Sequence, residues 1–131
     1  MNSHLVQRAR EAHEEAYVPY SEYPVGAAIE AADGQIFTGC NIENVNYSNA
    51  LHAEEVAIAD AIKQGKDSFT RLAVSSASRD AVTPCGRCRQ TLSEFVDGGF
   101  EIICDGGNDQ TVTYTLEELF PQTMTADMLP E

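Results

Sequence analysis

The sequence predicts an α/β protein, a three-layer α/β/α sandwich built on a mixed five-stranded sheet. Stretches with the period of a helix alternate along the chain with short apolar or β-branched runs. Asp33-Gly34 lies between the first two of these runs and is a strong signal for an antiparallel hairpin, whereas helical stretches separate later strands and indicate crossover connections. A sheet with both kinds of connection is mixed, and helices cover its two faces.

The first half of the chain supplies a helix, the hairpin and a second helix. Small and apolar residues recur at helical spacing over residues 3–16, and Pro19 stops that helix. The hairpin strands are expected at 25–29 and 35–40. Alanine, glutamate, isoleucine and valine at helical period predict the second helix over 51–63.

The second half adds three strands and two helices. A short apolar run predicts a buried strand, and Pro84 opens the next helix because proline is favoured in a first turn. The expected elements are a strand at 72–74, a helix at 85–95, strands at 102–104 and 111–114, and a short helix at 116–119.

The length and composition of the chain limit the classes of protein to which it can belong. The 131 residues correspond to one domain of common size, so a single domain is expected over 1–131. No stretch approaches the roughly twenty apolar residues of a membrane span, and the first residues lack the apolar core of a signal peptide. A cytoplasmic protein without a membrane partner is expected, with its four cysteines reduced and available to a metal.

The chain is strongly acidic. Its formal net charge is −13, and Lys63 and Lys66 are its only lysines. Such a balance repels a phosphate backbone, so nucleic acid is not expected as a partner. The charge has two interpretations that stay open, a solvated surface that resists aggregation or an adaptation to a salt-rich, halophilic cytoplasm.

Three candidate metal ligands and one acid form the most informative pattern. His52, Cys85 and Cys88 offer three corners of a zinc tetrahedron and leave the fourth for water, and Glu54 can move protons of that water. Each feature alone has an ordinary explanation: a histidine at a helix start, a redox Cys-x-x-Cys, or a glutamate near a helix dipole. Their order and spacing together match the H-x-E…P-C-x-x-C signature of zinc deaminases, so one zinc ion per chain is expected.

The chain resembles the short-chain members of the cytidine deaminase family over nearly its whole length. The resemblance rests on the zinc motifs at 52–54 and 84–90, on YVPYSEYPVGAA at 17–28, and on GCNIEN at 39–44, which is similar to the family's ribose-binding segment. It implies zinc-dependent hydrolytic deamination of cytidine and deoxycytidine, a salvage reaction that yields uridine or deoxyuridine and ammonia. It also implies a cytidine deaminase-like fold.

The resemblance assigns roles to particular residues. Asn41 and Glu43 would hydrogen-bond the ribose, although both could simply close a turn after the strand. Tyr23 stands where the family usually places a phenylalanine against the pyrimidine, and the Ala53 backbone would contact the base. Glu54 would carry protons from the attacking water to N3 and then to the departing amino group.

The chain departs from the family pattern in three places. His52 replaces a cysteine and Glu55 replaces the arginine that usually follows the catalytic glutamate; two thiolates and a neutral imidazole leave zinc with no net charge, so no arginine is needed. At the C-terminus, Met124 stands near a phenylalanine that often enters a neighbouring subunit's site. Short family members are homotetramers, and Tyr47 resembles an interface residue, so a homotetramer is expected.

Other functions remain open at this point. The same chemistry could act on deoxycytidylate, blasticidin S or a free base, although Asn41 and Glu43 favour a nucleoside. A non-catalytic interaction module stabilised by zinc would keep its function without Glu54. An editing deaminase of RNA or DNA needs a basic track, which the charge of −13 disfavours.

Overall fold

The computed structural model describes residues 2–130, with side chains from His4 onward, and confirms the predicted mixed sheet. The strand order is β2-β1-β3-β4-β5; β3 and β4 are parallel, and the other neighbours are antiparallel. The elements are α1 (Asn2–His13), β1 (Val25–Ala31), β2 (Ile36–Cys40), the 3-10 helix η1 (Tyr47–Asn49), α2 (Ala53–Lys63), β3 (Phe69–Ser76), α3 (Gly86–Phe95), β4 (Glu101–Asp105), β5 (Thr111–Thr115), α4 (Leu116–Leu119) and the 3-10 helix η2 (Ala126–Met128).

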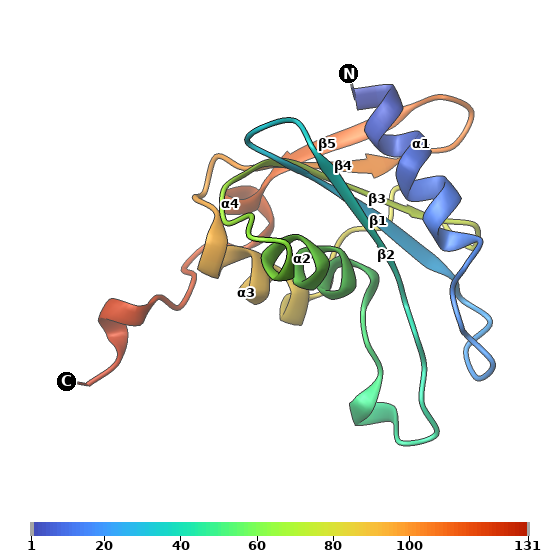
Figure 1. Cartoon of the computed structure of the whole chain (residues 1–131), viewed down its shortest axis with the longest axis horizontal. Coiled ribbons are helices and arrows are strands. Elements are labelled where there is room, and N and C mark those ends of the chain that lie inside the picture. The colour runs from blue at the N-terminus through green and yellow to red at the C-terminus, as the bar shows by residue number, and fades with distance from the viewer. Residues whose placement is uncertain (1, 131) are drawn as a thin grey trace.

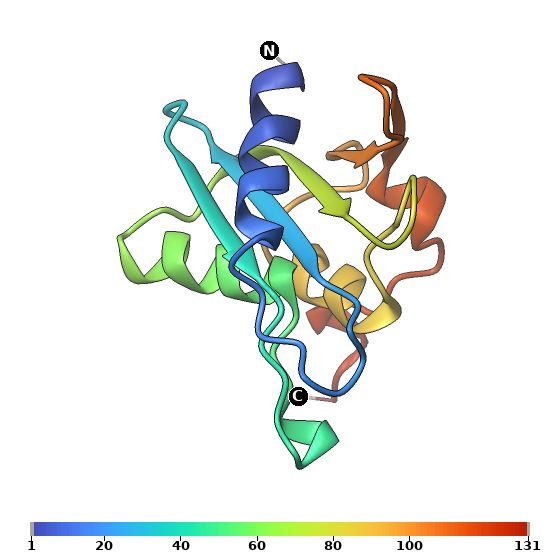
Figure 2. The ribbon, with the colours of Figure 1, turned by 90° about the vertical axis from the view of Figure 1, so that its right-hand side faces the viewer.

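The three layers follow from side chains that alternate along the central strands. Helix α1 covers one face of the sheet, and α2 and α3 cover the other (Figures 1 and 2). In β3, Ala73 packs toward α1, whereas Leu72 and Val74 pack toward the opposite core, and all three are fully buried. Because both faces of this strand are covered, its residues form an unbroken apolar run in the sequence.

Some boundaries differ from the sequence prediction. Helix α1 ends at His13 instead of residue 16, because the backbone of Tyr17 bonds to Asn41 and Glu43 and draws the chain out of the helix. Strand β3 begins at Phe69, before the apolar run, because Phe69 pairs with Ala31 of β1.

Two segments extend away from the sandwich. Residues 41–50, which include η1, form an arm that projects from the end of the sheet, and the C-terminal segment after α4 reaches outward as well (Figures 1 and 2). Among the helices of residues 2–130, none combines the length and the apolar character needed to cross a membrane.

Candidate metal centre

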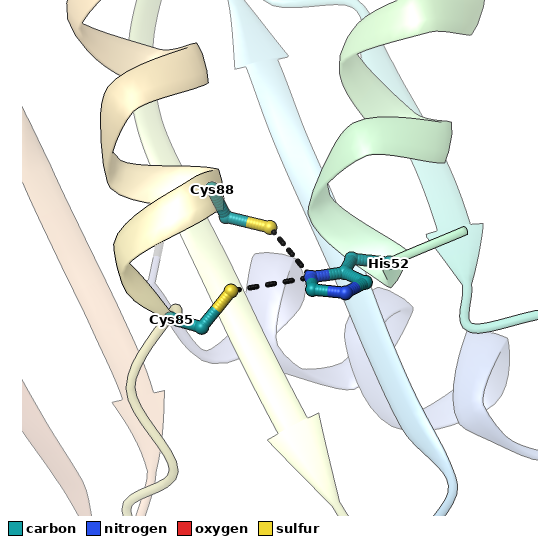
Figure 3. A group of neighbouring side chains, drawn as sticks. All are labelled: His52, Cys85 and Cys88. Carbon is teal, nitrogen blue, oxygen red and sulfur yellow. Dashed lines mark hydrogen bonds between the residues drawn. The ribbon is translucent and has the colours of Figure 1, made fainter. Parts of the chain in front are cut away.

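The three predicted ligands meet at the N-terminal ends of two helices. His52 is the N-cap residue of α2, Cys85 is the N-cap residue of α3, and Cys88 lies in the first turn of α3. The His52 Nδ1 atom lies 3.2 Å from the Cys85 Sγ atom and 3.3 Å from the Cys88 Sγ atom (Figure 3). Residues separated by more than thirty positions therefore converge on one point.

The chemistry of this donor set fits zinc. The candidate ligand atoms, one from each of the three residues, all lie within 4.8 Å of one another, and ligand atoms of a tetrahedral zinc ion stand about 3.5 Å apart at ordinary bond lengths. Mixed imidazole and thiolate ligation is typical of zinc among intracellular ions. Burial raises the pKa of the Cys88 thiol, so a cation is needed to hold that group as a thiolate.

Glu54 lies beside this cluster and is almost completely buried. Its exposed fraction is 5%, and it follows His52 by two residues in the first turn of α2. Burial raises the pKa of the Glu54 carboxyl above its ordinary value, with the negative charge of Glu55 acting in the same direction. A carboxyl group in this position is suited to accept and return a proton.

A cavity of about 200 Å³ opens onto the cluster. Its lining combines apolar residues, among them three valines, with a few polar and ionisable ones, as in many small-molecule sites. The lining residues are Val25, Asn41, His52, Ala53, Glu54, Val74, Val82, Thr83 and Cys85. A larger hollow of about 550 Å³ lies between α3 and the C-terminal segment, but it contains none of the three ligands.

The predicted substrate residues do not all reach this cavity. Asn41 and Ala53 line it; the Asn41 side chain accepts a hydrogen bond from Val25 N–H (2.9 Å) and donates one to the Tyr23 carbonyl (2.9 Å). Tyr23 is half-buried and is absent from the lining. Asn41 therefore lies at the cavity, and its side-chain amide holds the start of β1 in place.

Glu43 lies in a different hollow. Its carboxylate accepts hydrogen bonds from the Tyr20 and Ser21 backbones and from the Ser21 hydroxyl, which lowers its pKa, the hydroxyl most of all. With Tyr20 and Tyr47, whose rings meet edge to face, Glu43 lines a hollow of about 310 Å³ on the projecting arm. In this chain Glu43 therefore organises the loop at residues 20–21.

Several residues of the site carried no sequence signal. Val82 and Thr83 line the cavity from the irregular loop before α3, where no periodicity marks them. Arg89 fixes that loop, because its guanidinium donates to the Pro84 carbonyl (2.7 Å), the Leu119 carbonyl (2.7 Å) and, at 3.3 Å, the Thr83 hydroxyl. Its position directly after Cys88 was the one available hint.

Glu55 also has a partner that the sequence did not predict. A ligand set with no net charge on zinc needs no arginine beside Glu55, yet Arg87 of α3 donates a hydrogen bond to the Glu55 carboxylate (2.9 Å). The cation beside Glu55 therefore comes from the neighbouring helix α3.

Comparison with known proteins identifies the relatives of this chain. Residues 1–105 match the family model described as the cytidine and deoxycytidylate deaminase zinc-binding region. The chain is 40% identical to a cytidine deaminase of Sporosarcina psychrophila, over 95% of this chain and 92% of that protein, and 35% identical to one of Halalkalibacterium halodurans, over 94% and 93%.

Solved structures agree with the sequence matches. The crystal structure of cytidine deaminase from Burkholderia pseudomallei superimposes with a TM-score of 0.89 at 32% identity, covering 95% of this chain and 99% of that one. The enzyme from Mycobacterium tuberculosis superimposes with a TM-score of 0.80 at 35% identity, covering 93% and 95%. The α/β fold predicted from the sequence is therefore confirmed.

Proposed function

The chain belongs to the cytidine deaminase family, and from that membership we propose that it deaminates cytidine and deoxycytidine to uridine and deoxyuridine with one zinc ion per chain. The observation that carries the proposal is the buried Glu54, which lines the same cavity as His52 and Cys85. The two named relatives over nine-tenths of this chain are both cytidine deaminases.

The residues divide the chemistry between a metal site and a proton carrier. His52, Cys85 and Cys88 would hold zinc, which when bound supplies Lewis acidity and brings the pKa of water toward neutrality. The Glu54 carboxylate accepts one proton from the attacking water and donates it to N3 of the pyrimidine, which makes C4 electrophilic. As the C4–O bond forms and the C4–N bond breaks, Glu54 transfers the second water proton to the amino group, which leaves as ammonia.

The nucleoside would be held at the open side of the cavity. The Asn41 amide keeps one lone pair and one N–H beyond its two hydrogen bonds in the chain, enough to contact a ribose hydroxyl. The Ala53 backbone would contact the base, with Tyr23 closing the pyrimidine site. Glu43 would reach the ribose through the oxygen lone pairs that Tyr20 and Ser21 leave unused, and its charge disfavours a phosphate nearby.

The proposal includes a homotetramer. Support comes from the projecting arm, where Val45 and Tyr47 are each 77% exposed and Ile42 is exposed as well, and from Leu51, which directly follows the arm and is also exposed. Met124 in the C-terminal segment is also exposed and would contact a neighbouring subunit. Light scattering during size-exclusion chromatography tests this: four times the 14.3 kDa of the chain supports the tetramer, and the mass of one chain refutes it.

An ultraviolet assay tests the activity. Purified protein is mixed with cytidine, deoxycytidine or deoxycytidylate at low and at high potassium chloride, with Glu54→Ala as the control and the zinc content of both proteins measured. We expect rapid loss of cytosine absorbance for the two nucleosides and none in the variant. Absence of turnover with zinc bound would refute the substrate assignment and favour either another amino-bearing heterocycle as substrate or the non-catalytic zinc module.

A further inference from the structure

The Glu55 carboxylate uses its two oxygens on two different parts of the metal site. Its Oε1 atom accepts a hydrogen bond from the backbone N–H of His52 (2.9 Å), and its Oε2 atom accepts one from Nε of Arg87 (2.9 Å). His52 precedes α2, whereas Arg87 belongs to α3. One side chain therefore ties together the two segments that carry the metal ligands.

The two ends of this bridge lie next to ligands. The hydrogen bond at Oε1 holds the backbone of His52, the candidate histidine ligand. It is the bond of a capping box, in which a glutamate side chain reaches back to the N-cap residue. The hydrogen bond at Oε2 holds Arg87, one of the two residues between Cys85 and Cys88. The Glu55 side chain is 19% exposed and that of Arg87 is 50% exposed, so the pair lies at the rim of the site, partly shielded from water.

We propose that Glu55 and Arg87 are positioning residues that hold the His52 imidazole at the separation from the two sulfur atoms that zinc requires. The inference rests on the zinc site of the proposed function. The observed separations of 3.2 and 3.3 Å span two helices, and the Glu55 bridge joins the starts of those helices. A pre-assembled ligand set loses less conformational entropy on binding, and groups behind metal ligands tune affinity in this way.

A purely electrostatic role predicts opposite signs for the two residues. If the pair acted only through charge, Glu55→Gln would remove a carboxylate that attracts zinc and would speed its release, whereas Arg87→Ala would remove a cation that repels zinc and would slow its release. If the pair acts by position, both variants break the link and both release zinc faster. The direction of the change in Arg87→Ala therefore separates the two explanations.

The experiment measures the rate at which a chromogenic chelator removes zinc from the loaded protein. We expect Glu55→Gln and Arg87→Ala each to release zinc about three- to tenfold faster than the wild type. Groups that support metal ligands often have larger effects, but this pair is partly exposed to water. The double variant should be no faster than the faster single variant, since both changes break one link. Arg87→Lys should restore most of the slow release, and Asp60→Asn, the same chemical change later on α2, should leave the rate unchanged.

One further readout, the absorption spectrum of the cobalt-loaded protein, keeps the test decisive. With cobalt in place of zinc, the ligand-field absorption should shift in Glu55→Gln and Arg87→Ala but not in Asp60→Asn, because altered ligand geometry changes those bands. Arg87 is half-exposed, so its replacement tests the bridge even if Glu55→Gln fails to fold. Slower release from Arg87→Ala, or rate effects that multiply in the double variant, would overturn the proposal.

This test is independent of the substrate assignment. Wild-type protein that binds zinc but turns over no nucleoside would refute the proposed function and leave the release rates interpretable. Wild-type protein that binds no zinc would overturn both proposals.

Discussion

Substituting alanine for Gly39 of β2 tests how the packing of α2 controls the active site. A Cβ atom on Gly39 would lie 2.5 Å from the backbone nitrogen of Ala57 and closer still to the carbonyl oxygen of Ala53, both in α2. Because non-bonded atoms need about 3.5 Å, α2 must retreat from the sheet by about 1 Å. The start of α2 carries His52 and Glu54, so both would move relative to the cysteines of α3.

The size of the effect follows from that displacement. Overpacking of this kind costs about 1–3 kcal/mol in the free energy of unfolding, which for a chain of this size lowers the melting temperature by about 4 °C per kcal/mol. A misplacement of about 1 Å can cost roughly 100-fold in rate. We therefore expect kcat/KM of Gly39→Ala to fall by about that factor at a temperature where the variant is fully folded and zinc-loaded.

Gly26→Ala is the matched control. A Cβ atom there would lie 2.5 Å from the backbone nitrogen of His13 and closer to the carbonyl oxygen of Ala9, so it displaces α1 on the opposite face of the sheet. We expect a similar loss of stability with kcat/KM unchanged. Wild-type kcat/KM in Gly39→Ala, or an equal loss in Gly26→Ala, would refute the reasoning that displacement of α2 impairs the reaction.

Three further predictions concern single side chains. Glu54→Gln should retain zinc by elemental analysis while kcat falls about 10²- to 10⁴-fold, the usual contribution of an acid–base group, and a smaller loss would contradict its role as proton carrier. His52→Cys should keep its zinc but lose activity, because a third thiolate adds negative charge near Glu55; wild-type turnover would refute this. The Arg10 hydrogen bonds lower the pKa of Asp105 to about 2, so its ionised form stabilises the fold above about pH 4, and this contribution is lost as the pH falls toward 2. The free energy of unfolding of Asp105→Asn at pH 7 should therefore be about 2 kcal/mol lower than that of the wild type. Urea unfolding at neutral and at acid pH measures this difference. If the difference does not shrink in acid, the ion pair is not its cause.

The sequence by itself determined the elements and the donor chemistry of the candidate ligands. Helical period, the Asp33-Gly34 turn and the apolar run at 72–74 are local patterns, and each corresponds to an element of the structure because local backbone preference and the buried face agree there. The identities of His52, Cys85 and Cys88 were also local information, since the types of donor atom already favour zinc.

Only the tertiary structure decided which groups meet. The link between Glu55 and Arg87, the hydrogen bond from Arg89 to the Leu119 carbonyl, and the hydrogen bond from Ser21 to Glu43 each join segments without a shared sequence pattern. The end of α1 at His13 has the same cause, because it depends on Tyr17 pairing with the chain at residues 41–43. Side-chain partners across such distances depend on the packing of whole elements, which no local propensity encodes.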